Sequence, residues 1–149
     1  MLKAVIIDTS AVARGLLNTV LLDGGYDVVG QGHTGNSAIA LMVKYQPQIV
    51  CIARDVFESD EASVRELRKD WPKSLLFMVS SEFDADTVQK AHAMGVNGFI
   101  VKPFNGGTVL KTIRNTVIAM VKRQQKALAD QNGEAAGDTA PDAGTDAGA

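Results

Sequence analysis

Short apolar runs alternate with segments of helical spacing along most of the chain, and this alternation limits it to few architectures. The runs are apolar at nearly every position, which is typical of strands covered on both faces of a sheet. They lie at 3–8, 26–30, 48–53, 75–80 and 98–101. Strands that alternate with helices favour a parallel sheet with right-handed crossovers. We therefore predict an α/β fold, a doubly wound (βα)5 sandwich with helices on both faces of the sheet.

The segments between the runs carry apolar residues at spacings of three and four, as one face of a helix does. Along the last segment this stripe comprises Val109, Leu110, Ile113, Val117 and Val121. Ser10, Asn36 and Asp84 precede or open three of the segments and are predicted N-cap residues. Because ligands of doubly wound sheets bind at the carboxyl ends of the strands, we expect a site near Asp8 and Ala53.

The charge pattern changes after Lys126. The formal net charge of the 149 residues is −2, yet five acids and no basic residue follow this lysine. The same stretch is rich in Ala, Asp and Gly and lacks aromatic and β-branched aliphatic residues. Such a composition buries too little surface to offset the entropy of ordering. We predict a folded domain over residues 1–126 and a disordered acidic tail over 127–149.

Several classes of protein are disfavoured by composition. The apolar runs are too short to cross a bilayer and no signal-peptide pattern opens the sequence, so a cytoplasmic protein with no membrane partner is expected. Lys and Arg are scattered, which disfavours nucleic acid as a partner. Cys51 lies within an apolar run and is interpreted as a small buried hydrophobe. His33 and His92 have no Cys or acid at ligand spacing, so no metal site is predicted.

Several local motifs resemble those of the response-regulator receiver family. Residues 5–14 read VIIDTSAVAR and are similar to the family's first strand and turn, apolar-Asp-Asp-Ser-x-x-x-Arg. Residues 93–104 read AMGVNGFIVKPF and resemble its last helix, strand and Lys-Pro-Phe passage. The resemblance covers roughly residues 3–125. It implies a flavodoxin-like (CheY-like) sandwich with strand order 2-1-3-4-5.

Two positions lack the acids that the resemblance leads us to expect. Ala53 stands where the family carries its phosphoacceptor Asp, and Thr9 replaces the second acid of the site, leaving Asp8. A methyl group cannot form an acyl phosphate, and one carboxylate is a poor site for Mg²⁺. We predict no catalytic residue, no cofactor, and at most weak Mg²⁺ binding at Asp8. The alternative acceptor is Asp55. It lies two residues further on, which by strand parity places it on the same face as Ala53, and it could accept the phosphoryl group if the register of this loop is shifted.

The resemblance also assigns the remaining positions of the site. Ser80 and Lys102, the latter followed by Pro103, take the places that contact phosphoryl oxygens, and Phe99 takes that of the family's switch aromatic. With Ala53 neutral, we expect Lys102 to turn toward Asp8, and we hypothesise that this pair fixes one signalling state. Arg54 is interpreted as an exposed residue at the rim of the empty position.

We therefore predict a stand-alone, non-enzymatic receiver of two-component signal transduction that acts without phosphorylation. Its expected partners are a histidine kinase or a downstream effector, with a homodimer through the last helix as a further interpretation. The predicted partner surface comprises Val88, Phe99, Ile113, Val117 and Met120.

Two alternatives remain open. One is a conventional receiver that is phosphorylated at Asp55. The other is a nucleotide-binding flavodoxin-like or Rossmann-like protein that uses Gly30–Gly35, a literal G-x-G-x-x-G between a predicted strand and helix.

Overall fold

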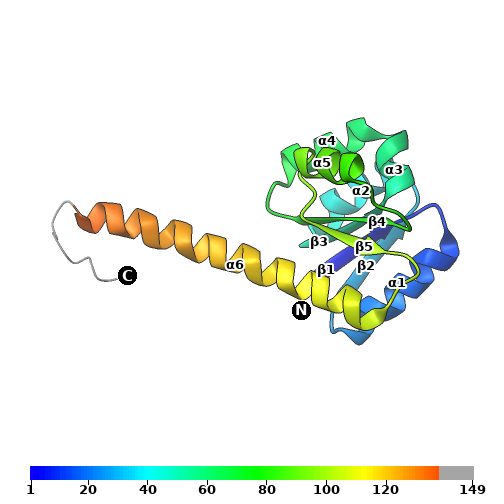
Figure 1. Ribbon diagram of the computed structural model, residues 1–149, viewed down its shortest axis with the longest axis horizontal. Helices are drawn as coiled ribbons and strands as arrows, with labels where there is room; N and C mark the ends of the chain where they lie inside the picture. Colours follow the sequence, from blue (N-terminus) through cyan, green and yellow to red (C-terminus); the bar gives the residue numbers. More distant parts are fainter. Residues whose placement is uncertain (138–149) are drawn as a thin grey trace. The chain divides into compact units, whose positions relative to one another are not determined.

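The computed structural model describes residues 1–137, with side chains through residue 131 (Figure 1). Its elements are β1 (Lys3–Ile7), α1 (Ala11–Asp23), β2 (Asp27–Gly32), α2 (Gly35–Tyr45), β3 (Ile49–Ala53), α3 (Arg54–Ser59), α4 (Glu61–Asp70), β4 (Leu75–Ser80), α5 (Ala85–Ala93), β5 (Gly98–Val101) and α6 (Gly106–Gly137). The chain divides into two compact units, Met1–Arg114 and a second that begins at Asn115. None of the described helices combines the length and apolarity that a membrane span requires.

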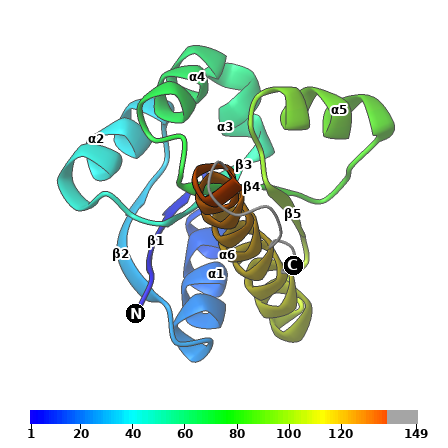
Figure 2. The same cartoon turned by 90° about the vertical axis from the view of Figure 1, so that its left-hand side faces the viewer.

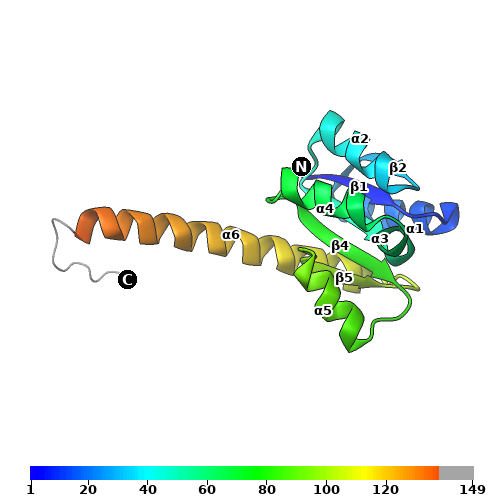
Figure 3. The same ribbon diagram turned by 90° about the horizontal axis from the view of Figure 1, so that it is seen from above.

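The five strands of the first unit form one parallel sheet in the order β2-β1-β3-β4-β5 (Figures 1 and 3). Figure 2 shows α2, α3, α4 and α5 over one face of this sheet and α1 over the other. The order reverses between β1 and β3, because the chain first winds outward to β2 and then returns past β1. The predicted fold class and strand order are confirmed.

The core lies around the three central strands. Every residue from Ala4 to Ile7 and from Ile49 to Ala53 is at most 2% exposed, as expected where helices cover both faces of a sheet. Cys51 is fully buried, and burial raises the pKa of its thiol to about 12. The interpretation of Cys51 as a buried hydrophobe agrees with this placement.

Short polar side chains begin the helices. The side chains of Ser10 and Asp84 accept hydrogen bonds from the third amide beyond them, as predicted for N-caps. The third predicted cap is wrong, because Thr34 and not Asn36 caps α2, accepting from the Ser37 amide at 3.0 Å. Asn36 is the second residue of the helix. The Thr34 hydroxyl competes for the same role two residues earlier.

Two boundaries differ from those expected. The helix α3 was not predicted; it follows β3 without an intervening loop, and no side chain caps its start. The last helix continues through Gly137, so a disordered tail from residue 127 does not match the structure over 127–137. Strong helix formers (Lys, Arg, Gln, Ala and Leu) occupy residues 122–129 and favour this continuation. Residues 138–149 lie outside the described part of the chain, and their disorder stays a prediction.

Candidate functional site

A cleft of about 280 Å³ opens at the carboxyl ends of the strands, beside the reversal between β1 and β3. Its lining comes from four strand ends and from α3: Asp8, Thr9, Ser10, Ala53, Arg54, Asp55, Glu58, Val79, Ser80, Ser81 and Lys102. This is where ligands of doubly wound sheets bind. Of the predicted site residues, the structure brings six together here and leaves Phe99 and Pro103 outside the lining.

An ion pair between Asp8 and Lys102 lies at the centre of the cleft. The Lys102 Nζ atom donates to Asp8 Oδ2 at 2.8 Å, and the Ser10 amide donates to Asp8 Oδ1 at 2.9 Å. The Asp8 side chain is 6% exposed and that of Lys102 is 28% exposed. The pairing expected from the sequence is therefore present, and both Asp8 carboxylate oxygens already accept a hydrogen bond. The Lys102–Pro103 peptide bond is cis.

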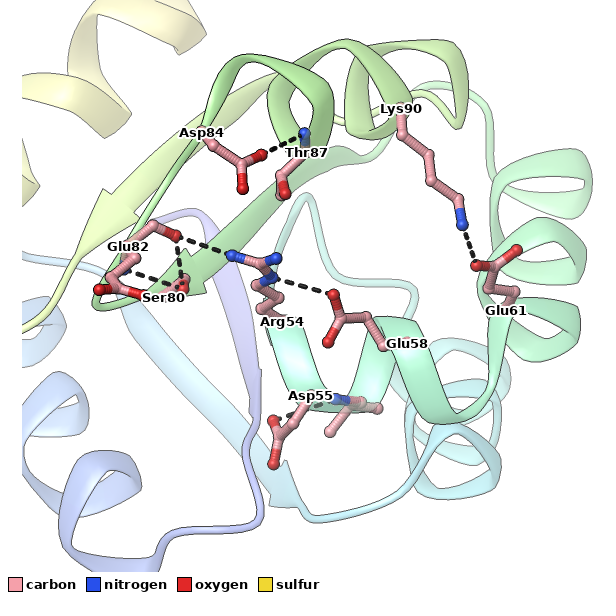
Figure 4. Close-up of polar contacts among 10 residues, drawn as sticks. Arg54, Asp55, Glu58, Glu61, Ser80, Glu82, Asp84, Thr87 and Lys90 are labelled. Carbon is pink, nitrogen blue, oxygen red and sulfur yellow. Dashed lines mark hydrogen bonds and ion pairs between the residues drawn. The ribbon is translucent and has the colours of Figure 1, made fainter.

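Ala53 ends β3 and is 2% exposed, so the position that the resemblance assigns to the phosphoacceptor presents a methyl group. Asp55 lies in the first turn of α3, which means that the parity argument placing it on the same strand face as Ala53 is wrong. The chain has left the strand by Arg54. The Asp55 carboxylate is exposed and accepts a hydrogen bond from the Thr9 hydroxyl at 2.6 Å. It also accepts one from the Val56 amide at 3.0 Å (Figure 4).

The carboxylate and hydroxyl oxygens that line this cleft do not fit a bound Mg²⁺ ion. Magnesium ions require several oxygen ligands in near-octahedral geometry, usually including carboxylates. Here Asp8 is paired with Lys102, and Asp55 accepts from Thr9 and from a backbone amide. Among the side chains that the structure describes, those of residues 1–131, no group of three or more His, Cys, Asp or Glu is arranged to hold a metal. We therefore assign no chemistry through a metal ion here.

The Ser80 hydroxyl is engaged with the loop that follows β4. It donates to the Glu82 carbonyl at 2.8 Å, and the Glu82 amide donates back to Ser80 Oγ at 3.2 Å (Figure 4). Arg54 reaches the same loop, since its Nη1 atom donates to the Glu82 carbonyl at 3.2 Å. Its Nε atom donates to Glu58 at 3.0 Å, and this bond raises the pKa of the guanidinium. Arg54 is 26% exposed, so the predicted exposed rim residue is half-buried and bonded.

The predicted partner residues fall into different environments. Phe99 is half-buried and packs edge-on against Phe83 and His92, with ring centroids 5.1 and 5.2 Å apart. Val88 is half-buried as well. Ile113 is fully buried, so its assignment to a partner surface is wrong. The first turns of α6 belong to the first unit, and Ile113 fills its core. Val117 and Met120 are half-buried residues of the second unit.

The glycines of the Gly30–Gly35 motif serve helix packing. A Cβ atom on Gly30 would lie 2.6 Å from Leu41, and one on Gly32 would lie 2.6 Å from Ser37 Cβ. At Gly35 it would collide with the Asp60 side chain. The motif spans the end of the edge strand β2 and the start of α2, away from the reversal between β1 and β3. The nucleotide-binding alternative loses its structural basis, because α2 and Asp60 fill the space that the glycines leave.

Some cleft residues were not predicted from the sequence. Glu58 and Ser81 had no motif to mark them, and Glu82 acts only through its backbone carbonyl and amide. A backbone group leaves no signal in the residue type. The helical i, i+4 spacing of Arg54 and Glu58 is a usable signal for their ion pair once α3 is recognised.

Comparison with known proteins gives one consistent result. The family model described as the response regulator receiver domain matches residues 4–114. A chemotaxis protein CheY from Listeria monocytogenes is 30% identical over 115 residues, covering 76% of this chain and 96% of that protein. A protein-glutamate methylesterase/protein-glutamine glutaminase from Haloarcula marismortui is 27% identical over 148 residues, but the chain spans only 39% of that enzyme. The chemotaxis response regulator CheY4 of Vibrio cholerae has a similar structure, with a TM-score of 0.68 and 27% identity, over 78% of this chain and 98% of that one.

Proposed function

The chain belongs to the response regulator receiver family, and we propose that it is a receiver of two-component signalling that works without accepting a phosphoryl group. The observation that carries the proposal is the buried methyl group of Ala53 at the end of β3, 2% exposed, beside an ion pair that already occupies Lys102. A carboxylate nucleophile is required to form an acyl phosphate. The side chain at this position has none.

The other polar groups of the cleft support the same proposal. A receiver that binds a phosphoryl group needs a cationic side chain and a hydroxyl free to meet its oxygens. Lys102 is paired with Asp8, and the Ser80 hydroxyl is bonded to the Glu82 backbone. Accepting a phosphoryl oxygen would first require both contacts to break. We therefore propose a protein-interaction module that catalyses no reaction and acts on a partner, either a histidine kinase or a downstream effector in the cytoplasm.

The proposed partner surface lies along α5 and β5. Val88 and Phe99 contribute half-buried apolar side chains, and Val101 at the end of β5 is 54% exposed. A hollow of about 300 Å³ adjoins them, lined by β5 and the first turns of α6. An exposed apolar edge beside a hollow is the kind of surface that protein partners bind. This surface keeps Val88 and Phe99 of the predicted one. It omits Ile113, which is buried, and Val117 and Met120, which belong to the second unit.

We also propose that the second unit pairs with a second copy of the chain. Ile118, Val121 and Leu128 are 44%, 40% and 60% exposed on the described part of this helix. Helices in proteins gain most of their stability by packing an apolar stripe. Light scattering coupled to size exclusion should therefore show a dimer that Val121→Asp converts to a monomer. A wild-type monomer at all protein concentrations would refute the pairing and leave the partner surface on α5 and β5 unaffected.

The phosphoryl proposal is tested by intact mass after incubation with acetyl phosphate and Mg²⁺. We expect the wild type to gain no acid-labile phosphoryl group. The matched positive control is the double variant Thr9→Asp/Ala53→Asp, which returns both acids to the cleft and should gain one. Circular dichroism checks that this variant folds.

Gain of a phosphoryl group by the wild type would overturn the proposal. Loss of that gain in Asp55→Asn would then identify the protein as a conventional receiver with a shifted acceptor. Fluorescence of Trp71 during addition of beryllofluoride, a phosphoryl mimic, gives an independent reading. We expect no change in the wild type.

A further inference from the structure

The side chain of Arg54 connects α3 to the loop between β4 and α5. Arg54 is the first residue of α3 and directly follows Ala53. Its guanidinium crosses the mouth of the cleft to the loop between β4 and α5, where Nη1 donates to the Glu82 carbonyl at 3.2 Å (Figure 4). Its Nε atom donates to Glu58 on the next turn of α3, at 3.0 Å. The guanidinium therefore bonds within α3 and to the loop at the same time.

The Glu82 carbonyl receives two donors at once. Besides Arg54, the Ser80 hydroxyl donates to it at 2.8 Å. A carbonyl oxygen has two lone pairs, and these two donors occupy both. The Glu82 amide in turn donates to Ser80 Oγ at 3.2 Å. Ser80, Glu82 and Arg54 thus form one closed set of hydrogen bonds that turns the Ser80 hydroxyl toward the loop.

The charges around Arg54 extend this connection to the start of α5. Asp84 is the N-cap of α5, accepts from the Thr87 amide at 2.7 Å, and lies in the field of Arg54. Its pKa is lowered mainly by the Thr87 hydrogen bonds and to a smaller extent by Arg54. Glu58 and Glu82 also face the guanidinium. The cation therefore lies among acids of both elements that it joins.

A second ion pair holds α5 further along. The Lys90 Nζ atom donates to Glu61 Oε2 on α4 at 2.6 Å (Figure 4). Each of these ion pairs is exposed and weak when taken singly. Together they attach α5 to the α3 and α4 side of the domain at its start, through Arg54, and near its end, through Lys90.

We propose that Arg54 is a positioning residue that holds the loop 81–84 and the start of α5 in one conformation without a bound phosphoryl group. The Ser80 hydroxyl, which would contact such a group, is committed to the loop by the same set of bonds. The consequence for partner binding at α5 and β5 rests on the function proposed above. The connection itself does not, and it can be measured on the free protein.

Amide hydrogen exchange on the full chain tests this proposal. In Arg54→Ala, we expect the amides of residues 82–88 to exchange roughly three to ten times faster, because one charge-assisted bond to the loop is lost. Arg54→Lys should fall between, since an ammonium keeps the charge but lacks the fork that reaches Glu58 and Glu82 together. Arg65→Ala is the matched control, because Arg65 also makes an exposed i, i+4 pair, with Glu61 at 3.6 Å. It should leave these amides unchanged.

A further variant separates the connection from a local effect on α3. Glu58→Gln weakens the contact within α3 and leaves the bond from Arg54 to the Glu82 carbonyl in place. Its amides at 82–88 should exchange nearly as slowly as those of the wild type. If Glu58→Gln matches Arg54→Ala, or if Arg54→Ala matches the wild type, the positioning role is refuted. Either result would leave the phosphoryl experiment and its outcome untouched.

Discussion

Replacing Lys102 with Met tests the ion pair at the centre of the cleft. The change keeps the aliphatic part of the side chain and removes the ammonium that contacts Asp8 at 2.8 Å. Breaking a fully buried pair costs about 3–5 kcal/mol, whereas exposed pairs contribute about 0–1 kcal/mol. The Asp8 side chain is 6% exposed, but Lys102 is 28% exposed and the Ser10 amide still donates to the carboxylate. We therefore expect Lys102→Met to lower the free energy of unfolding by about 2 kcal/mol.

Urea unfolding followed by Trp71 fluorescence and circular dichroism measures this loss. With a typical slope of about 1–3 kcal/mol per molar urea, the midpoint should fall by about 1 M. The double variant Asp8→Asn/Lys102→Met leaves no unpaired charge, so it should cost less than the sum of the two single variants, with a coupling of about 1–2 kcal/mol. Additive effects, or a loss below about 0.5 kcal/mol in Lys102→Met, would show that the ammonium is solvated and that the pair does not exist.

Three further outcomes are expected. Arg68→Met should destabilise the fold by about 2–4 kcal/mol in urea, because it removes bonds to Gly95, Trp71, Ser74 and Asn97. The Thr87 bonds lower the pKa of Asp84 from its ordinary 3.8, so Asp84 stabilises the fold above pH 3.8 and loses this contribution as the pH falls through the lowered pKa. Asp84→Asn keeps the N-cap, and its melting temperature should depend less on pH in that acid range than the melting temperature of the wild type. The Cys51 thiol, with its pKa raised to about 12, should resist iodoacetamide in the native protein and react in urea.

The central strands show what the sequence can predict. Apolar runs such as Ala4–Ile7 have to be covered on both faces, and the alternation with helices then leaves a parallel sheet as the economical arrangement. Once the resemblance sets the register of the third strand, Ala53 falls at its carboxyl end, where the structure also places it. The pairing of Lys102 with Asp8 follows from charge alone, because Ala53 offers the ammonium no anion.

The helices show where this reasoning stops. Periodicity identifies the apolar face of α6 but not how far along the helix that face is covered. Val109 and Ile113 are at most 3% exposed in the first unit, whereas Ile118 and Val121 of the second unit are 44% and 40% exposed. The short helix α3 was missed because no loop or capping side chain separates it from β3. This omission also produced the wrong placement of Asp55, since strand parity ends where a helix begins.

The last prediction concerns whether the cleft would respond to a phosphoryl group if an acceptor carboxylate were restored. The polar groups of the cleft form hydrogen bonds with one another. Lys102 donates to Asp8, Thr9 donates to Asp55, and both Ser80 and Arg54 donate to the Glu82 carbonyl. We therefore expect that restoring an acceptor carboxylate is not enough to restore a conformational response to phosphorylation. We expect phosphorylated Thr9→Asp/Ala53→Asp to keep slow amide exchange at residues 82–88, because Arg54 still holds the loop.

Adding Arg54→Ala to this double variant should allow the loop to change conformation when the phosphoryl group is attached. In the triple variant, phosphorylation should change exchange at residues 82–88, whereas the same treatment of the double variant should not. A full response in the double variant would show that Arg54 yields to the phosphoryl group, and the two missing acids at Thr9 and Ala53 would then be the only obstacle to signalling by phosphorylation. The comparison thus separates the proposed loss of phosphoryl chemistry, which we attribute to the two missing acids at Thr9 and Ala53, from the proposed loss of the conformational response, which we attribute to hydrogen bonds to the Glu82 carbonyl.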